Sequence, residues 1–129
     1  MGAPKLQIQT LDHISLNIMD LAEARKFYGD ALGLEEVDRP EKITSPGAWF
    51  RIGGFMLHLN VGPRAEGSGS HLALWTEDVY ALAKAVEAAG FAVQWERKKK
   101  IPGVDRFFTG DPSGNRIEIK GSDGTVWAA

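Results

Sequence analysis

The chain has 129 residues, of which 43% are hydrophobic and 25% charged, and its formal net charge is −2. This length and composition predict one globular domain of a soluble protein and exclude a disordered chain. The absence of cysteine excludes disulfides, thiolate nucleophiles, iron–sulfur clusters and zinc sites built on sulfur. The slightly acidic charge argues against general nucleic-acid binding. No apolar run approaches the roughly 20 residues that cross a membrane, and the first nine residues hold no continuous apolar segment of the signal-peptide type, so a cytoplasmic location is expected.

The first half of the chain predicts a strand, a helix and three further strands. Residues 11–19 alternate apolar and polar side chains, which is the period of a strand with one buried face. Asp20 is the expected N-cap of a helix whose apolar residues recur at helical spacing until Gly33 ends it. Further strands are expected at residues 34–39, 48–52 and 55–61, the last two joined by a Gly53-Gly54 turn.

The second half repeats this order. Residues 70–76 alternate again, Asp78 is the expected N-cap, and Gly90 ends the second helical pattern. Strands are expected at residues 91–96, 104–109 and 116–120, with a turn at residues 111–115. The sequence therefore predicts an α+β fold with two tandem βαβββ modules in a single domain. The modules cover about residues 10–61 and 70–120, with a glycine-rich linker at 62–69 and a short tail at 121–129, where Trp127 is expected to pack on a neighbouring surface.

All three histidines and one glutamate fall at matching places in the two modules. His13 and His71 lie on the first strands, and His58 and Glu118 lie on the last strands. Strand alternation puts all four on the face opposite the aliphatic residues. Imidazole and carboxylate suit a divalent ion such as Zn, Ni, Fe, Mn or Co. The sequence therefore predicts a metal site with these four ligands, and the alternative for His58 is a base beside the metal.

Aromatic and arginine side chains are expected to line the same faces. Trp49 and Arg51 share a face of one strand, and Arg106 and Phe108 share a face of another. Because arginine binds carboxylates through two hydrogen bonds, such a pocket suits an anionic or oxygen-rich small substrate. The alternative is that both arginines are surface residues with buried stems. The four cations at residues 97–100 are expected to form a solvated loop, with a lid over an anionic substrate as the alternative.

These motifs resemble the vicinal oxygen chelate superfamily, which includes glyoxalase I, extradiol dioxygenases, fosfomycin-resistance enzymes and metal-free bleomycin-binding proteins. The resemblance covers about residues 10–120 and is most specific at residues 11–16 (LDHISL) and 111–118 (DPSGNRIE). By this resemblance the metal ligands match His13, His71 and Glu118. The fourth glyoxalase ligand, usually a carboxylate, matches His58.

The resemblance implies curved sheets that form half-barrels and pair in a homodimer. Each metal site then takes His13 and His58 from one chain and His71 and Glu118 from the other, with pairing inside one chain as the alternative. The resemblance also implies a metal-dependent enzyme that chelates vicinal oxygens of a small substrate and stabilises an enolate-like intermediate. Glu118 or His58 is the expected catalytic proton carrier. Lyase or isomerase chemistry is expected first and ring-cleaving dioxygenase chemistry next, while a protein that sequesters an antibiotic is the alternative class.

Overall fold

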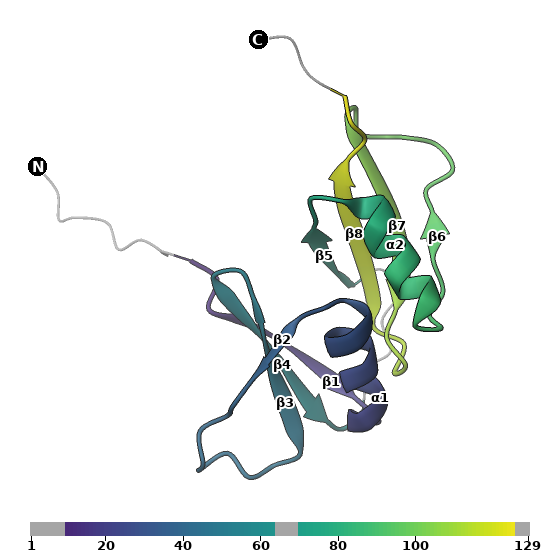
Figure 1. Ribbon diagram of the computed structural model, residues 1–129. Coiled ribbons are helices and arrows are strands. Elements are labelled where there is room, and N and C mark those ends of the chain that lie inside the picture. Colours follow the sequence, from purple (N-terminus) through teal and green to yellow (C-terminus); the bar gives the residue numbers. More distant parts are fainter. Residues whose placement is uncertain (1–9, 64–69, 126–129) are drawn as a thin grey trace, which may run out of the picture.

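The computed structural model describes residues 10–63 and 70–125 as two βαβββ modules (Figure 1). The first module consists of β1 (His13–Ile18), α1 (Leu21–Arg25), the π-helix η1 (Lys26–Ala31), β2 (Glu35–Val37), β3 (Gly47–Ile52) and β4 (Phe55–Val61). The second consists of β5 (His71–Trp75), α2 (Val79–Ala88), β6 (Gln94–Trp95), β7 (Val104–Gly110) and β8 (Arg116–Ser122). The predicted order of elements and the α+β class are confirmed.

Each module forms its own four-stranded sheet, with strand orders β1-β4-β3-β2 and β5-β8-β7-β6. The first and last strands of a module pair in parallel, and the other neighbours pair antiparallel. The helix and the two middle strands of each module together form the long connection that a parallel pair requires. As a result, β1 with His13 lies beside β4 with His58, and β5 with His71 lies beside β8 with Glu118.

Both helices begin where the sequence predicts. The carboxylate of Asp20 accepts a hydrogen bond of 3.0 Å from the backbone N–H of Glu23, and Asp78 does the same for Ala81. The first helix changes to π-helical hydrogen bonding from Lys26 onward. The sequence did not predict this change, because the buried residues Phe27, Tyr28 and Ala31 have the one- and four-residue spacing that an α-helix also shows.

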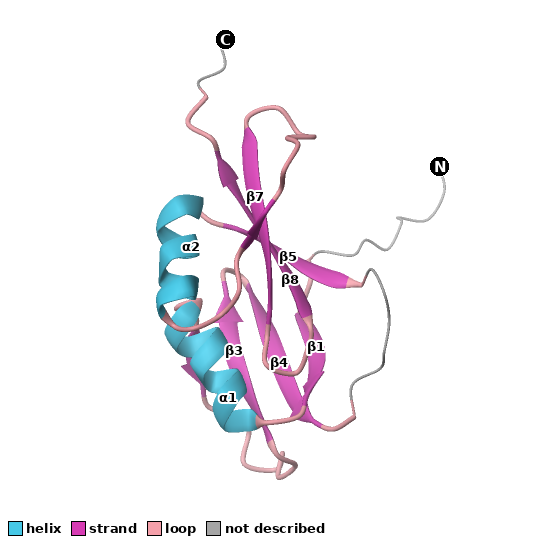
Figure 2. Cartoon of the chain, turned by 90° about the vertical axis from the view of Figure 1, so that its right-hand side faces the viewer, coloured by secondary structure: helices cyan, strands magenta, loops and turns pink. Residues whose placement is uncertain are grey.

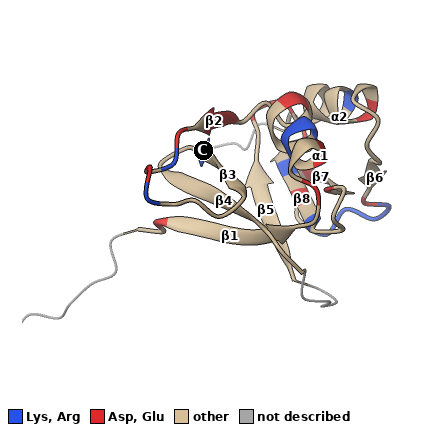
Figure 3. Cartoon of the chain, turned by 90° about the horizontal axis from the view of Figure 1, so that it is seen from below, with Lys and Arg blue, Asp and Glu red and all other residues tan. Residues whose placement is uncertain are grey.

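The helices lie together on one side of the molecule and the sheets on the other (Figure 2). Apolar residues of both modules form one buried cluster under the helices, and the partly buried ring of Phe91 packs edge to face on Phe27 of this cluster at 4.9 Å. The other face of each sheet, which we call its open face, has no helix over it. Charged residues gather mainly on the helices and loops (Figure 3).

The turn at residues 111–115 of the second module forms hydrogen bonds with the first module. The Tyr28 hydroxyl donates a hydrogen bond of 2.7 Å to the buried carboxylate of Asp111. Ser113 Oγ accepts one of 2.7 Å from the backbone of Met19, and the Asn115 amide donates one of 2.9 Å to the carbonyl of Asn17. This polar contact fixes the second module against the first.

The strands differ in length from the predicted ranges. β8 continues to Ser122, so the first residues of the predicted tail are strand, and β6 contains only Gln94 and Trp95 of the expected 91–96. Trp127 and linker residues 64–69 lie outside the described residues. No helix in the described part of the chain is long and apolar enough to cross a membrane.

Candidate metal centre

The first pair of candidate ligands lies on the open face of the first sheet. His13 on β1 and His58 on β4 stack with ring centroids 4.1 Å apart, and the Trp49 ring of β3 stacks on His58 at 3.8 Å. His58 therefore lies between His13 and Trp49. Burial lowers the pKa of His58, and the neighbouring His13 lowers it further. This favours the neutral imidazole, which is the form that binds metals.

Asp12 orients the exposed imidazole of His13. Its carboxylate oxygen Oδ2 lies 2.7 Å from His13 Nδ1. A carboxylate on one ring nitrogen fixes the tautomer and leaves Nε2 to act as a ligand. Asp12 was not predicted as a site residue, although it is adjacent to His13 in the sequence.

The second pair lies on the open face of the second sheet. His71 Nε2 on β5 is 3.5 Å from Glu118 Oε2 on β8, and Glu118 is only 5% exposed. In a tetrahedral zinc site with bonds of about 2.1 Å, two ligand atoms lie roughly 3.4 Å apart. This nitrogen and this oxygen therefore fit two ligands of one divalent ion.

Arg106 holds the other oxygen of Glu118. Its Nη1 donates a hydrogen bond of 2.6 Å to Glu118 Oε1, and its Nε donates one to Glu96 Oε2. Hydrogen bonding to Glu96, and then to Glu118, raises the pKa of Arg106. The sequence predicted Arg106 as a substrate-binding residue, whereas in the structure two carboxylates engage its guanidinium. Glu96 was missed because the pairing of the short β6 strand cannot be inferred from its sequence.

The remaining predicted pocket residues are divided between the two sheets. Arg51, next to Trp49 on the first sheet, is exposed and lies 3.7 Å from Glu35. On the second sheet, the Phe108 ring lies 4.2 Å from the guanidinium carbon of Arg116 and 5.4 Å from that of Arg106. Arg116 was not predicted, although it precedes Glu118 by two residues and so occupies the same face of β8.

The cationic segment 97–100 is tied to its own sheet. Lys99 Nζ lies 3.2 Å from Asp105 and also pairs with Asp123, and the backbone N–H of Lys100 donates a hydrogen bond to Glu96. The hydrogen bond that Lys99 donates to Asp123 lowers the pKa of the Asp123 carboxyl to about 2. The same hydrogen bond raises the pKa of Lys99. These ion pairs hold Lys99 against Asp105 and Asp123 of its own module.

The two pairs remain separate within one chain. Within residues 10–63 and 70–125, no three His, Asp or Glu side chains lie close enough together to hold a metal ion. The structure thus brings His13 to His58 and His71 to Glu118. It does not unite the four ligands, as pairing of the modules inside one chain would require.

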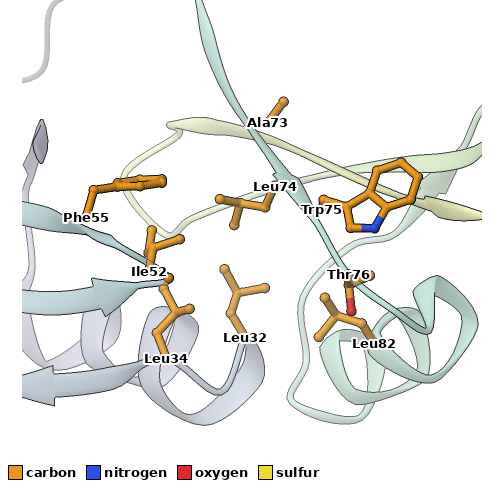
Figure 4. Close-up of a pocket in the computed structure, with 10 residues that line it drawn as sticks. Leu32, Leu34, Ile52, Phe55, Ala73, Leu74, Trp75, Thr76 and Leu82 are labelled. Atoms are coloured by element: carbon orange, nitrogen blue, oxygen red, sulfur yellow. The ribbon is translucent and has the colours of Figure 1, made fainter. Parts of the chain in front are cut away.

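A separate apolar cavity of about 410 Å³ lies between the two modules (Figure 4). Leu32, Leu34 and Ile52 line it from the first module, and Leu74 and Leu82 line it from the second. None of its ten lining residues is ionisable. The chemistry-bearing side chains therefore lie on the open faces and not in this cavity.

Comparison with known proteins identifies relatives that align with most of the chain. A family model described as Glyoxalase/Bleomycin resistance protein/Dioxygenase superfamily matches residues 10–119. Glyoxylase I 4 of Arabidopsis thaliana is 28% identical over 130 aligned residues, which cover 92% of this chain and 74% of the relative. A crystal structure from Bacillus anthracis, described as a glyoxalase family protein, superposes with a TM-score of 0.82 at 29% identity and covers 93% of this chain and all of its own.

A further relative shares more identity over a shorter stretch. The manganese-dependent 2,3-dihydroxybiphenyl 1,2-dioxygenase of Geobacillus genomosp. 3 is 36% identical over 92 residues. The match covers 69% of this chain but only 29% of that enzyme, so the similarity concerns a part of the longer protein.

Proposed function

The chain belongs to the glyoxalase/bleomycin resistance protein/dioxygenase superfamily, and on this basis we propose that it is a metal-dependent enzyme that acts on two neighbouring oxygens of a small substrate. The main support for this proposal is the second pair, in which Oε2 of the buried Glu118 lies 3.5 Å from His71 Nε2. The first pair, His13 and His58, occupies the matching strands of the other sheet. The similarity to the Geobacillus relative, which is named a manganese-dependent dioxygenase, supports a divalent ion.

The proposed site is shared between two copies of the chain. His13 and His71 lie on β1 and β5, which are end strands of their sheets and so can approach a second copy. In the two-fold symmetric dimer that we propose, β1 of one copy faces β5 of the other, and the symmetry repeats this contact. Each site then combines His13 and His58 from one copy with His71 and Glu118 from its partner copy.

The residues of this chain can hold the ion and move a proton. When bound, a divalent ion supplies Lewis-acid polarisation of two vicinal oxygens and stabilises enolate-like charge on the substrate. If the substrate displaces one of the ligands from the ion, His58 or Glu118 can carry the proton. For Glu118 the carrier atom is Oε2, since its Oε1 is held by Arg106. Trp49 covers one face of His58 and excludes water there.

Lyase or isomerase chemistry is the first candidate reaction, because two polarised oxygens and a nearby proton carrier suffice for it. Ring-cleaving dioxygenase chemistry is the second candidate. It is favoured by the 36% identity to the Geobacillus enzyme and by the combination of histidines with one carboxylate, which suits iron(II) or manganese.

Metal analysis by mass spectrometry tests the proposal. Protein purified without added metal is expected to retain close to one divalent ion per chain, and Glu118→Gln is expected to lose it. Glu87→Gln, an exposed change on α2, is the matched control and should retain the ion. Bound iron or manganese together with oxygen uptake on a catechol would identify a dioxygenase. Bound nickel or zinc without oxygen uptake would identify a lyase. Tight antibiotic binding that survives chelators and His71→Ala would instead identify a sequestering protein and refute the enzyme.

A further inference from the structure

A small hollow opens beside the second ligand pair. It has a volume of about 270 Å³ and lies between β6, β7 and β8. Its lining residues are Ala92, Gln94, Phe108, Thr109, Gly110 and Arg116. In the strand register Phe108 is opposite both Gln94 and Glu118, and Arg116 is opposite both Gly110 and His71. Because directly opposite residues share a face of a sheet, this hollow is on the open face, next to His71 and Glu118.

Arg116 differs from Arg51 and Arg106, because no carboxylate in the described part of the chain engages its charge. Arg51 lies near Glu35, and Arg106 is held by Glu96 and Glu118. Arg116 forms no ion pair with any residue in the described ranges, and its guanidinium carbon lies 4.2 Å from the centre of the Phe108 ring. Stacking on an aromatic ring orients a guanidinium while its N–H groups remain available at the edge.

We propose that this hollow binds a carboxylate of the substrate through Arg116 on the Phe108 platform. The inference rests on the proposed function, since it takes the two chelated oxygens to lie at His71 and Glu118. A guanidinium binds a carboxylate through two parallel hydrogen bonds, and the Gln94 amide at the rim offers a further donor. The substrate is therefore an acid. Its carboxylate binds at Arg116, while its two neighbouring oxygens bind the metal at His71 and Glu118.

Two probes that differ only in a carboxylate test this. Catechol and 3,4-dihydroxybenzoate present the same vicinal oxygens, and their affinities for the manganese-loaded protein can be measured by calorimetry. The wild type is expected to prefer the acid about ten-fold. Arg116→Gln should reduce this preference to about one without changing catechol affinity, and Arg116→Lys should give an intermediate value. Arg25→Gln, which removes a guanidinium from the helix side, should change neither affinity.

A second measurement separates failure of this inference from failure of the proposed function. Benzoate is titrated into the metal-free protein while the arginine Nε–Hε signals are followed by NMR. We expect one signal to shift, and that signal to be missing in Arg116→Gln. If neither diol binds while benzoate shifts this signal, the metal-centred function fails and the carboxylate site stands. An unchanged Arg116 signal, or a preference for the acid that persists in Arg116→Gln, overturns the site.

Discussion

The Tyr28 hydroxyl of the first module donates a 2.7 Å hydrogen bond to Asp111 of the second, and both residues are buried. Hydrogen bonds to charged groups contribute about 1.5–3 kcal/mol. Tyr28→Phe is therefore expected to lower the free energy of unfolding by this amount, measured by urea denaturation. The same change at the exposed Tyr80, whose hydroxyl meets Asp105, is the control and should cost less than about 1 kcal/mol. Equal effects at both positions would contradict a structural role for the Tyr28–Asp111 contact.

The same hydroxyl predicts a pH dependence of stability. Burial raises the pKa of Tyr28 above its ordinary value, and the charge of Asp111 and its hydrogen bond raise it further. Below a pH of about 10, Tyr28 is protonated in both folded and unfolded chains, so its full contribution is present. Above that pH the unfolded chain releases the proton and the folded chain retains it, so stability falls by up to about 1.4 kcal/mol per pH unit.

Comparison with Tyr28→Phe isolates this effect from the other groups that titrate at high pH. Urea denaturation is measured for both proteins at about pH 8 and about pH 11. The stability advantage of the wild type should shrink between these values. An advantage that stays constant would show that the Tyr28 pKa is the same in the folded and unfolded chains.

The close approach of α2 to β8 predicts an intolerant glycine. A Cβ added at Gly121 would lie 2.8 Å from the Val79 Cβ and 3.0 Å from the Thr76 carbonyl oxygen. Gly121→Ala is therefore expected to destabilise the protein by about 1–3 kcal/mol through overpacking. Gly54→Ala is the matched control, because nothing lies within 4 Å of a Cβ there. Thermal denaturation of both variants checks this, and a neutral Gly121→Ala would show that the helix can shift at no cost.

The hydrogen bond from Arg106 to Glu118 predicts that a change at Arg106 weakens metal binding. Arg106→Lys keeps the positive charge but loses the planar fork that holds Glu96 and Glu118 together. Loss of a group that orients a metal ligand typically weakens metal binding about 10–100-fold. Competition with a chromophoric chelator measures the affinity, and urea denaturation of the metal-free protein shows whether the fold is retained. Wild-type metal affinity in a folded Arg106→Lys variant would remove Arg106 from the site.

The sequence was sufficient to predict the modules and the faces of their strands. Strand alternation placed His13, His58 and His71 on the exposed sides, and the structure brings His13 to His58. The capping aspartates Asp20 and Asp78 marked both helix starts, because the N-cap hydrogen bond is a local interaction.

The partners of the site residues could not be predicted in the same way. Glu96 reaches Arg106 only because β6 pairs with β7 in one particular register, and two residues of strand carry too little pattern to define it. The π-helical segment η1 buries Phe27, Tyr28 and Ala31, a spacing that an α-helix also shows, so the pattern did not reveal the π-helix. Whether an arginine is engaged or available depends on carboxylates contributed by other strands, as Arg106 and Arg116 show.

We propose that each metal site is shared between two copies of the chain. His13→Ala and His71→Ala are each expected to bind no metal as pure proteins. If they are mixed, unfolded and refolded together, mixed dimers contain one site that keeps all four ligands, so about a quarter of the wild-type metal content should return. Metal analysis of the mixture measures this directly. No recovery above the sum of the two separate proteins would contradict a shared site.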